Sequence, residues 1–319
     1  MYAPIALFAF NRADLLTRTL GALSRNTFAA QSSLTIFCDG PRTEVERKAT
    51  EAVRAVARTI KGFASVEIVC REINMGCAGS IIDGLRQMFS IYERLIVIED
   101  DILCSKHTLA FLNEGLKRYE RQKTVFNIAA WSPPPSLLSL GCEYAWDVYA
   151  IPRFNCWGWA SWRDRFASVD WSVADYEQFR VSPRLRAAFD AGGSDMSGLL
   201  DGQIRGDLDS WDICMDYARF KQGCVGINPV HSYTTNIGMG CGTHTTTRTD
   251  RFDNDITAAL PVTRVRWLEQ LFVDAQILKS YQTAVVPYTP CWKKILKKAL
   301  ATVGLLDAAR ELHKKIHDC

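Results

Sequence analysis

The stretch that most constrains this chain is an apolar run that ends in three consecutive acids. Residues 95–98 are Leu, Ile, Val and Ile, and Glu99, Asp100 and Asp101 follow them directly. A short run rich in β-branched residues is typical of a strand buried on both faces of a parallel sheet. Because an unpaired carboxylate is costly to bury, we expect the acids in a crevice at the carboxyl end of this strand, where open α/β sheets bind ligands.

Three adjacent acids predict a cation or several hydrogen-bond donors close by, since clustered like charges destabilise one another. A hard divalent ion with oxygen ligands, Mn²⁺ or Mg²⁺, is the natural partner and is often shared with the phosphates of a substrate. The alternative is a solvated turn between strand and helix, in which one Asp caps the next helix. The clustering of the acids favours a functional site.

The first 130 residues alternate between strand-like and helix-like segments. This alternation predicts an α/β fold with a mostly parallel central sheet flanked by helices. Polar residues recur where the strands end: Arg12 after the first and Asp39 after the second. We therefore expect them to meet the acids at one edge of the sheet, as a nucleotide site requires. Strands are expected at 5–10, 34–38, 66–69, 94–98 and 125–130, and helices at about 15–26, 43–59, 78–90 and 107–119.

Several function classes are disfavoured by what the sequence lacks. No G-x-G-x-x-G follows the first strand and no G-x-x-x-x-G-K-[ST] occurs, which argues against dinucleotide-dependent oxidoreductases and P-loop NTPases. The net charge of +3 is too small to indicate a nucleic-acid partner. Neither a bilayer-spanning run nor a signal peptide is apparent, and the 11 cysteines form no C-x-x-C pair. We expect reduced thiols and a cytoplasmic location.

Beyond residue 130 the alternation fades. Residues 154–162 contain three tryptophans, which either pack in the core or form a wall for a flat sugar ring; the sequence leaves both open. Residues 187–209 are rich in Gly, Ser and Asp and predict a loop, either a lid or a mobile connection. A helix is expected from 210 to about 221, and Asp212 in its first turn is also explained by the helix dipole.

The end of the chain is basic and amphipathic. Residues 291–319 contain seven Lys or Arg and three acids, with apolar residues at helical spacing between the lysines. Such a helix lies on an anionic membrane surface or packs as an ordinary C-terminal helix with a solvated lysine face. Both interpretations stay open.

These motifs together resemble a GT-A glycosyltransferase, whose Asp-x-Asp motif holds a divalent ion against a nucleoside diphosphate. The sequence Ile98-Glu99-Asp100-Asp101 resembles the Glu-Asp-Asp form of this motif in the N-acetylglucosaminyltransferase I family and its bacterial, glycosyltransferase family 2-like relatives. The resemblance runs to about residue 244. Over more than thirty positions the chain matches a family pattern at the same spacing, with Trp211-Asp212, Gly223, Pro229, Gly238 and Thr243-His244.

The resemblance implies a role for each matched residue. Asp101 would ligate the metal, Asp100 would face the ribose and Glu99 would hold the donor sugar. Asp212 would be the general base that deprotonates the acceptor hydroxyl. The other donor or nucleotide contacts would be Arg12, Asp39, Trp211, Thr243 and His244, and the acceptor contacts would be Trp157, Gly158 and Trp159.

The resemblance also implies a Rossmann-like GT-A fold in three parts. Residues 1–130 would be the nucleotide-sugar-binding half, residues 131–262 the acceptor and catalytic half of the same domain, and residues 263–319 a helical, amphipathic appendage. The implied reaction transfers a sugar, with inversion, from a nucleoside-diphosphate sugar to a hydroxyl of a saccharide or lipid-linked saccharide, with Mn²⁺ or Mg²⁺ as cofactor and UDP favoured. Bacterial surface polysaccharide or lipopolysaccharide synthesis would be the setting, with the basic tail peripheral on the inner membrane face.

Two other function classes are weighed against this one. A nucleotidyltransferase that makes the sugar nucleotide would share the fold type and the acids, but residues 11–14 lack the Gly-rich basic loop expected after its first strand. A non-catalytic carbohydrate-binding protein on the same scaffold would not need Glu99, Asp100 and Asp212 intact. One departure from the family pattern is that Ile213 stands where the family has a second acid after the Trp.

Overall fold

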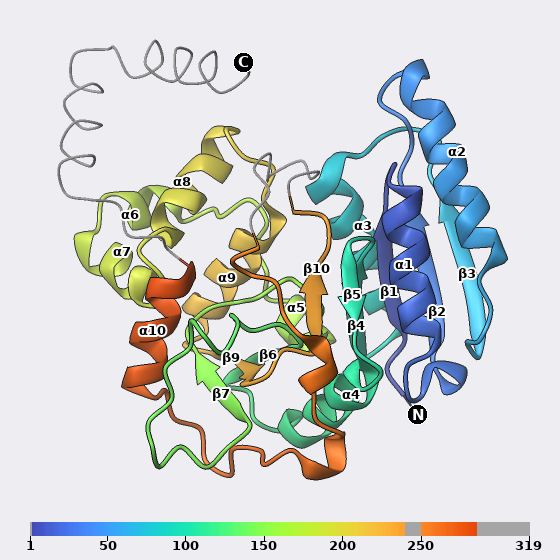
Figure 1. Ribbon diagram of the computed structural model, residues 1–319. Coiled ribbons are helices and arrows are strands. Elements are labelled where there is room, and N and C mark those ends of the chain that lie inside the picture. The colour runs from blue at the N-terminus through green and yellow to red at the C-terminus, as the bar shows by residue number, and fades with distance from the viewer. Residues whose placement is uncertain (1, 240–249, 286–319) are drawn as a thin grey trace, which may run out of the picture.

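The centre of the molecule is one eight-stranded sheet with helices on both faces (Figure 1). The computed structural model describes residues 2–239 and 250–285, so Thr243, His244 and the basic tail at 291–319 lie outside the described residues. In spatial order the strands are β3 (Ser65–Cys70), β2 (Ser33–Cys38), β1 (Ile5–Ala9), β4 (Arg94–Glu99), β8 (Trp159–Trp162), β6 (Val125–Ala129), β9 (Val225–Pro229) and β7 (Val148–Ile151).

Most of the sheet is parallel. Strands β3, β2, β1 and β4 pair in parallel, and so do β6 and β9. Strand β8 lies antiparallel between β4 and β6, and β7 lies antiparallel beside β9. The predicted α/β fold with a mostly parallel sheet is therefore confirmed. A separate two-stranded sheet pairs β5 (Ile102–Cys104) with β10 (Thr234–Asn236).

The two faces of the sheet bury two separate apolar cores. Along β1, Ile5 and Leu7 point into one core, whereas Ala6 and Phe8 point into the other, as expected for a strand with period-two alternation. The helices that contribute to the first core are α1 (Ala13–Ser24), α2 (Glu44–Thr59) and α4 (Thr108–Tyr119). Those that contribute to the second are α3 (Gly76–Ile91), α5 (Arg163–Phe166) and α9 (Trp211–Lys221).

A cluster of short helices stands on the side of the molecule opposite α2 and β3 (Figure 1). It comprises α6 (Tyr176–Arg180), α7 (Pro183–Phe189) and α8 (Met196–Arg205), and it packs on α9. The predicted loop at 187–209 is therefore wrong where α8 lies. Its glycines lower the intrinsic helix propensity, but Met196 and Leu200 are fully buried against Tyr217 of α9, and this packing stabilises the helix. Short 3-10 turns occur at Ala29–Gln31, Asp190–Gly192, Ile256–Ala258 and Val262–Arg264.

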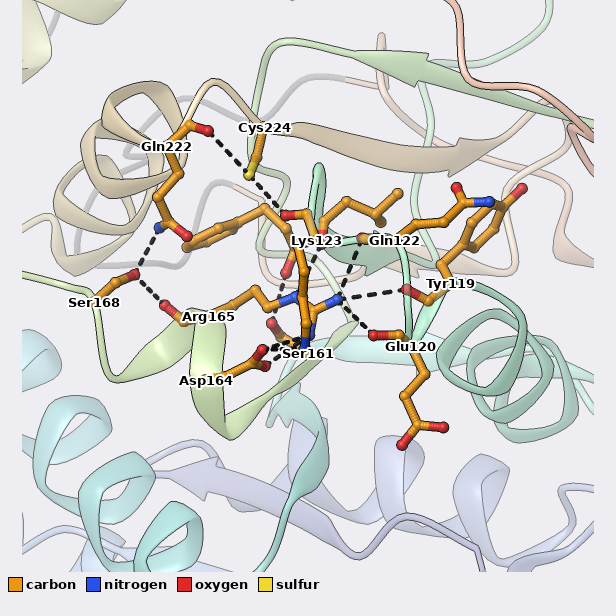
Figure 2. A network of polar contacts seen from close by, with 12 residues as sticks. Tyr119, Glu120, Gln122, Lys123, Ser161, Asp164, Arg165, Ser168, Gln222 and Cys224 are labelled. Atoms are coloured by element: carbon orange, nitrogen blue, oxygen red, sulfur yellow. Dashed lines mark hydrogen bonds and ion pairs between the residues drawn. The ribbon is translucent and has the colours of Figure 1, made fainter.

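A buried arginine fixes α5 against the end of α4 (Figure 2). The Arg165 guanidinium donates to the carbonyl oxygens of Glu120 at 3.0 Å and Gln122 at 3.3 Å, and it lies 4.2 Å from the centroid of the Trp162 ring. Carbonyls after the last turn of a helix lack partners within the helix and attract cations. Arg165 thus supplies donors that the C-terminal end of α4 needs.

Helix α10 (Ala275–Val285) packs against the edge of the main sheet. Tyr281 is fully buried, and its hydroxyl donates to Asn155 Oδ1 at 2.6 Å. The Asn155 amide in turn donates to Asn228 Oδ1 in β9 at 2.5 Å. This chain of hydrogen bonds connects the last described helix to the sheet. Among the described helices, none is both long and apolar enough to cross a bilayer.

The first prediction concerns this chain of hydrogen bonds. Replacing Tyr281 by Phe removes the donor and leaves Asn155 Oδ1 buried without it, so we expect the free energy of unfolding to fall by about 1–3 kcal/mol. Urea unfolding followed by circular dichroism measures the change. Lys279→Ala, on the exposed face of the same helix, is the matched control. Equal effects of the two substitutions would contradict the role given to Tyr281.

Candidate active site

A cavity of about 530 Å³ opens at the carboxyl edge of the parallel strands. Its lining includes Arg12, which follows β1, Asp39, which follows β2, and Glu99 and Asp100 at the end of β4. These strands are neighbours in the sheet, and parallel pairing places their ends side by side. The structure thus brings together the residues that the sequence placed at strand ends.

One end of the cavity is built around Asp39. Its Oδ1 accepts from the backbone N–H of Met75 at 3.0 Å, and its Oδ2 accepts from the Asn74 amide at 3.0 Å. Burial raises the pKa of Asp39, although the backbone donors of Met75 and Gly40 oppose the rise. Only glycine fits at position 40, because a Cβ there would lie 2.4 Å from the carbonyl carbon of Ile73. The result is a carboxylate held firmly, with oxygen lone pairs left for a ligand N–H.

An aromatic ring and a guanidinium lie at the same end. Phe10 lines the cavity, and the Arg42 guanidinium lies 5.0 Å from the centroid of its ring. Arg42 also pairs with Glu46 in the first turn of α2. A flat heterocycle can stack on such a ring while its N–H groups reach a carboxylate. The sequence did not indicate that Asn74, Phe10 and Arg42 line a site, since single residues next to turns show no pattern.

At the other end, Arg12 bridges two of the three acids. Its guanidinium pairs with Asp100 Oδ1 and, at 3.0 Å, with Asp101 Oδ2. Asp100 is 3% exposed, and its Oδ2 is buried without a hydrogen-bond partner among the described residues. Burial raises the pKa of Asp100 to about 6, although Arg12 opposes the rise. Burial lowers the pKa of Arg12, but the charges of Asp100 and Asp101 outweigh it and hold that pKa above its usual value.

The chain that follows β10 lies directly on Asp101. The backbone N–H of Ile237 donates to the Asp101 carbonyl at 2.8 Å. A Cβ on Gly238 would lie 2.4 Å from Asp101 Oδ2 and 2.9 Å from an Arg12 nitrogen, so only glycine allows this approach. The pairing of β5 with β10 holds the two segments in this register. In the sequence Gly238 was only part of a family pattern. The structure shows why a glycine is needed there: a side chain would clash with Asp101 and Arg12.

Glu99 lines the cavity, and no hydrogen bond to its carboxyl group is found within the described residues. Burial raises its pKa well above the usual value, and the charges of Asp101, Asp100 and Asp212 add to the rise. A carboxyl group that keeps its proton can donate as well as accept a hydrogen bond. Glu99 is therefore suited to a ligand group with hydroxyls.

Asp212 lies in the first turn of α9, where both of its carboxylate oxygens have a partner. The Ser210 hydroxyl donates to Oδ1, and the Cys156 thiol donates to Oδ2 at 3.7 Å. Its neighbour Trp211 is 4% exposed and packs among Phe154 and Trp159. Asp212 itself is half-buried, and its two hydrogen bonds fix the orientation of the carboxylate.

The three residues proposed as acceptor contacts, Trp157, Gly158 and Trp159, differ in how far they are buried. The Trp159 side chain is fully buried in β8 and offers no surface to a ligand, and Gly158 is buried as well. Trp157 is half-buried and packs edge-on against Trp131, with 4.7 Å between the ring centroids. Trp159 therefore packs in the core, whereas Trp157 keeps part of its surface exposed, and contact of this segment with a sugar stays a prediction.

The acid end has the chemistry that a divalent ion requires. Carboxylate oxygens of Asp100 and Asp101 are the ligand type that Mn²⁺ and Mg²⁺ prefer, and one Asp100 oxygen lacks a partner within the described chain. No cage of three or more His, Cys, Asp or Glu side chains is found among these residues. Such ions are commonly held by one or two carboxylates together with phosphate oxygens. The side chains fit an ion whose shell a phosphorylated ligand completes.

Comparison with known proteins leaves the family unassigned. No family model and no curated protein matches the chain. Among solved structures, S. aureus TarS 1–349 is similar at 10% sequence identity and a TM-score of 0.40, and the alignment covers 73% of this chain and 60% of the TarS chain. The complex of TarS 1–349 with UDP aligns with a TM-score of 0.41. The mannosyltransferase PcManGT from Pyrobaculum calidifontis, in complex with GDP-Man and Mn²⁺, aligns over 69% of this chain and 74% of its own, at 16% identity and a TM-score of 0.38. The alignment thus spans less than two thirds of the TarS fragment.

The second prediction concerns the pairing of Arg12 with Asp100. Arg12→Gln leaves a buried carboxylate without its cation, so we expect the free energy of unfolding at neutral pH to fall by about 2–3 kcal/mol. Burial already raises the pKa of folded Asp100, and loss of Arg12 raises it further. Below the wild-type folded pKa of about 6 both proteins hold Asp100 protonated, so the loss of stability is absent there and grows as the pH rises above 6 toward the higher folded pKa of the variant.

Urea unfolding at neutral pH and at pH about 4 measures both effects. Arg42→Gln, which removes an exposed pair with Glu46, is the matched control, with an expected change below about 0.5 kcal/mol. A loss in Arg12→Gln that does not depend on pH would show that the buried charge is not its cause.

Proposed function

We propose that this protein is an inverting, metal-dependent glycosyltransferase that uses a nucleoside-diphosphate sugar. The observation that supports this most is the one cavity that Asp39, Arg12, Glu99 and Asp100 line together, with Asp101 paired to Arg12 at 3.0 Å. One end of the cavity suits a base, and the other suits a diphosphate, a cation and a sugar.

The donor is placed by matching its parts to the cavity. Asp39 would accept an N–H of the base, with UDP favoured, and Asp100 would face the ribose. Arg12 and a divalent ion on Asp101 would meet the diphosphate, and Glu99 would hold the sugar. Trp211 would support this end from behind, and Thr243 and His244 would lie over the nucleotide.

The bound ion, Mn²⁺ or Mg²⁺, would supply Lewis-acid chemistry by neutralising the charge of the diphosphate leaving group. The chain adds a permanent positive charge of its own through Arg12. Because Arg12 is already held by two carboxylates, its orientation needs little rearrangement when a diphosphate binds.

Asp212 would act as the general base. It takes the proton of an acceptor hydroxyl, whose oxygen forms a bond to the anomeric carbon as the bond from that carbon to the diphosphate oxygen breaks. A single displacement of this kind inverts the anomeric configuration. Ser210 and Cys156 hold the carboxylate in place, which favours a fixed angle of approach.

The acceptor would be a saccharide or lipid-linked saccharide, as in bacterial surface polysaccharide or lipopolysaccharide synthesis. Trp157, with the backbone at Gly158, would contact it, while Trp159 would only support them from the core. We retain three parts, with donor binding in 1–130, acceptor binding and catalysis in 131–262, and an appendage in 263–319. The basic residues at 291–319 would contact an anionic membrane on its cytoplasmic face.

The third prediction tests donor and metal binding. We expect one nucleoside diphosphate among UDP, GDP, dTDP and ADP to raise the melting temperature strongly only with Mn²⁺, since a ligand at a hundredfold excess over its Kd adds about 2.7 kcal/mol. Asp101→Ala should abolish the part that depends on the metal. Asp207→Ala, which removes an exposed acid at 59% side-chain exposure, should not.

Two results would contradict the proposed function. If no nucleoside diphosphate shifts the melting temperature under any metal condition, the cavity is not a nucleotide–metal site. If a nucleoside triphosphate with a sugar phosphate releases pyrophosphate, the protein is a nucleotidyltransferase instead.

The fourth prediction separates binding from chemistry at Asp212. Asp212→Asn keeps the shape and one acceptor oxygen, and its amide N–H can donate to the other partner, but the base is removed, so we expect hydrolysis or transfer of the donor to fall about 10²–10⁴-fold. The Kd of the nucleoside diphosphate should change less than about twofold. Turnover that is the same in Asp212→Asn and the wild type would remove Asp212 from the mechanism.

A further inference from the structure

One acid in the cavity comes from a distant part of the chain. The described lining residues fall between Phe8 and Asp100, with the single exception of Asp209. Asp209 lies between α8 and α9, and α9 packs beside α3 in the second core (Figure 1). It is thus the point at which the second half of the chain reaches the proposed donor cavity.

Protein contacts position the carboxylate of Asp209 but leave some of its lone pairs without a hydrogen bond from the described residues. Its Oδ2 lies 3.4 Å from the backbone nitrogen of Ala78 in the first turn of α3, which is a long hydrogen bond. The same oxygen is 3.4 Å from where a Cβ on Gly76 would stand, so the absence of a side chain there gives it room. The start of a helix favours the charged form of an acid. The remaining lone pairs of Asp209 are available to a ligand.

Asp209 shares the lining of the cavity with two other acids, Glu99 and Asp100, which end β4. A ligand group that enters this cavity therefore meets carboxylates from both halves of the chain.

Within the described lining no cation is left for the sugar, because Arg12 and the proposed ion would both meet the diphosphate. The two arginines of this lining are Arg12, which already pairs with Asp100 and Asp101, and Arg42, which pairs with Glu46 near the Asp39 end. A neutral sugar offers hydroxyl and amide protons that these carboxylates can accept. A sugar acid would add a negative charge without a partner, which costs binding free energy.

We propose that Asp209 selects the donor sugar, accepting a hydrogen bond from a hydroxyl or amide N–H of a neutral sugar and excluding sugars that bear a carboxylate. This inference rests on the proposed function and narrows its substrate class. Asp209 precedes Asp212 by three residues and comes from the same connection to α9 as the proposed base. Asp209 is therefore a specificity residue contributed by the catalytic half.

The test compares two donors that differ in one group. UDP-glucose and UDP-glucuronate differ only at C6, where a hydroxymethyl group is replaced by a carboxylate, and UDP alone gives the baseline. If GDP is the nucleotide that binds, GDP-mannose and GDP-mannuronate replace them. Isothermal titration calorimetry with Mn²⁺ gives each Kd. For the wild type we expect the sugar acid to bind at least about tenfold more weakly, which corresponds to about 1.4 kcal/mol.

Two matched variants assign the effect to one side chain. Asp209→Asn should reduce the ratio of the two Kd values to about threefold or less while the Kd of UDP stays within about twofold. Asp207→Asn removes the same charge from an exposed position two residues earlier and should keep the wild-type ratio. Added salt should reduce the ratio as well, since Asp209 is exposed to solvent.

Two results would overturn the inference: equal affinity of the wild type for both donors, or an unchanged ratio in Asp209→Asn. Both leave binding of UDP intact, which distinguishes them from failure of the proposed function, in which no nucleoside diphosphate binds. Should Asp209→Asn fail to fold, Asp209→Ser is measured in the same way, and the wild-type ratio alone still decides whether sugar acids are excluded.

Discussion

The ion pairs between Arg12 and the acids after β4 are the interaction on which the rest of the site depends. Strand β4 is apolar and buried on both faces, so the charged residues that follow it can only lie at the edge of the sheet. Because β1 pairs in parallel with β4, with Phe8 opposite Glu99, the residue that follows β1 is delivered to the same place. A single guanidinium then offsets two carboxylates that would otherwise destabilise the edge.

The acids of the candidate site come from both halves of the chain. The Asp39 end of the cavity, the ion pairs and Glu99 come from the first 101 residues, whereas Asp209 and Asp212 come from the connection to α9 and its first turn. The two halves share one sheet through the pairing of β4 with β8 and β6 with β9. Fixed carboxylates suit a reaction in which charge must be met at once as it develops.

Much of the first half could be predicted from the sequence, because periodicity decides a strand or helix whose whole face is buried. Because the carboxyl ends of parallel strands meet at one edge of the sheet, the sequence also predicted that Arg12, Asp39 and Glu99 lie close together. The antiparallel strands β7 and β8 could not be foreseen, since their pairing partners lie far away in sequence. Helix α8 was missed because its stability comes from packing on α9 and not from its own residues. Asp209 showed no pattern at all, and only the fold brings it to the cavity.

The position of β8 also determines the order in which the sheet can be completed. This strand inserts between β4 and β6, both of which precede it in the chain. A nascent chain that ends near residue 130 therefore has β4 with one unpaired edge, and an exposed edge of an apolar strand invites pairing with other chains. The segment from 131 to 162 therefore covers this edge of β4, and β9 completes the sheet later by pairing with β6 and β7. A ribosomal pause before residue 162 would prolong the interval in which the β4 edge is exposed.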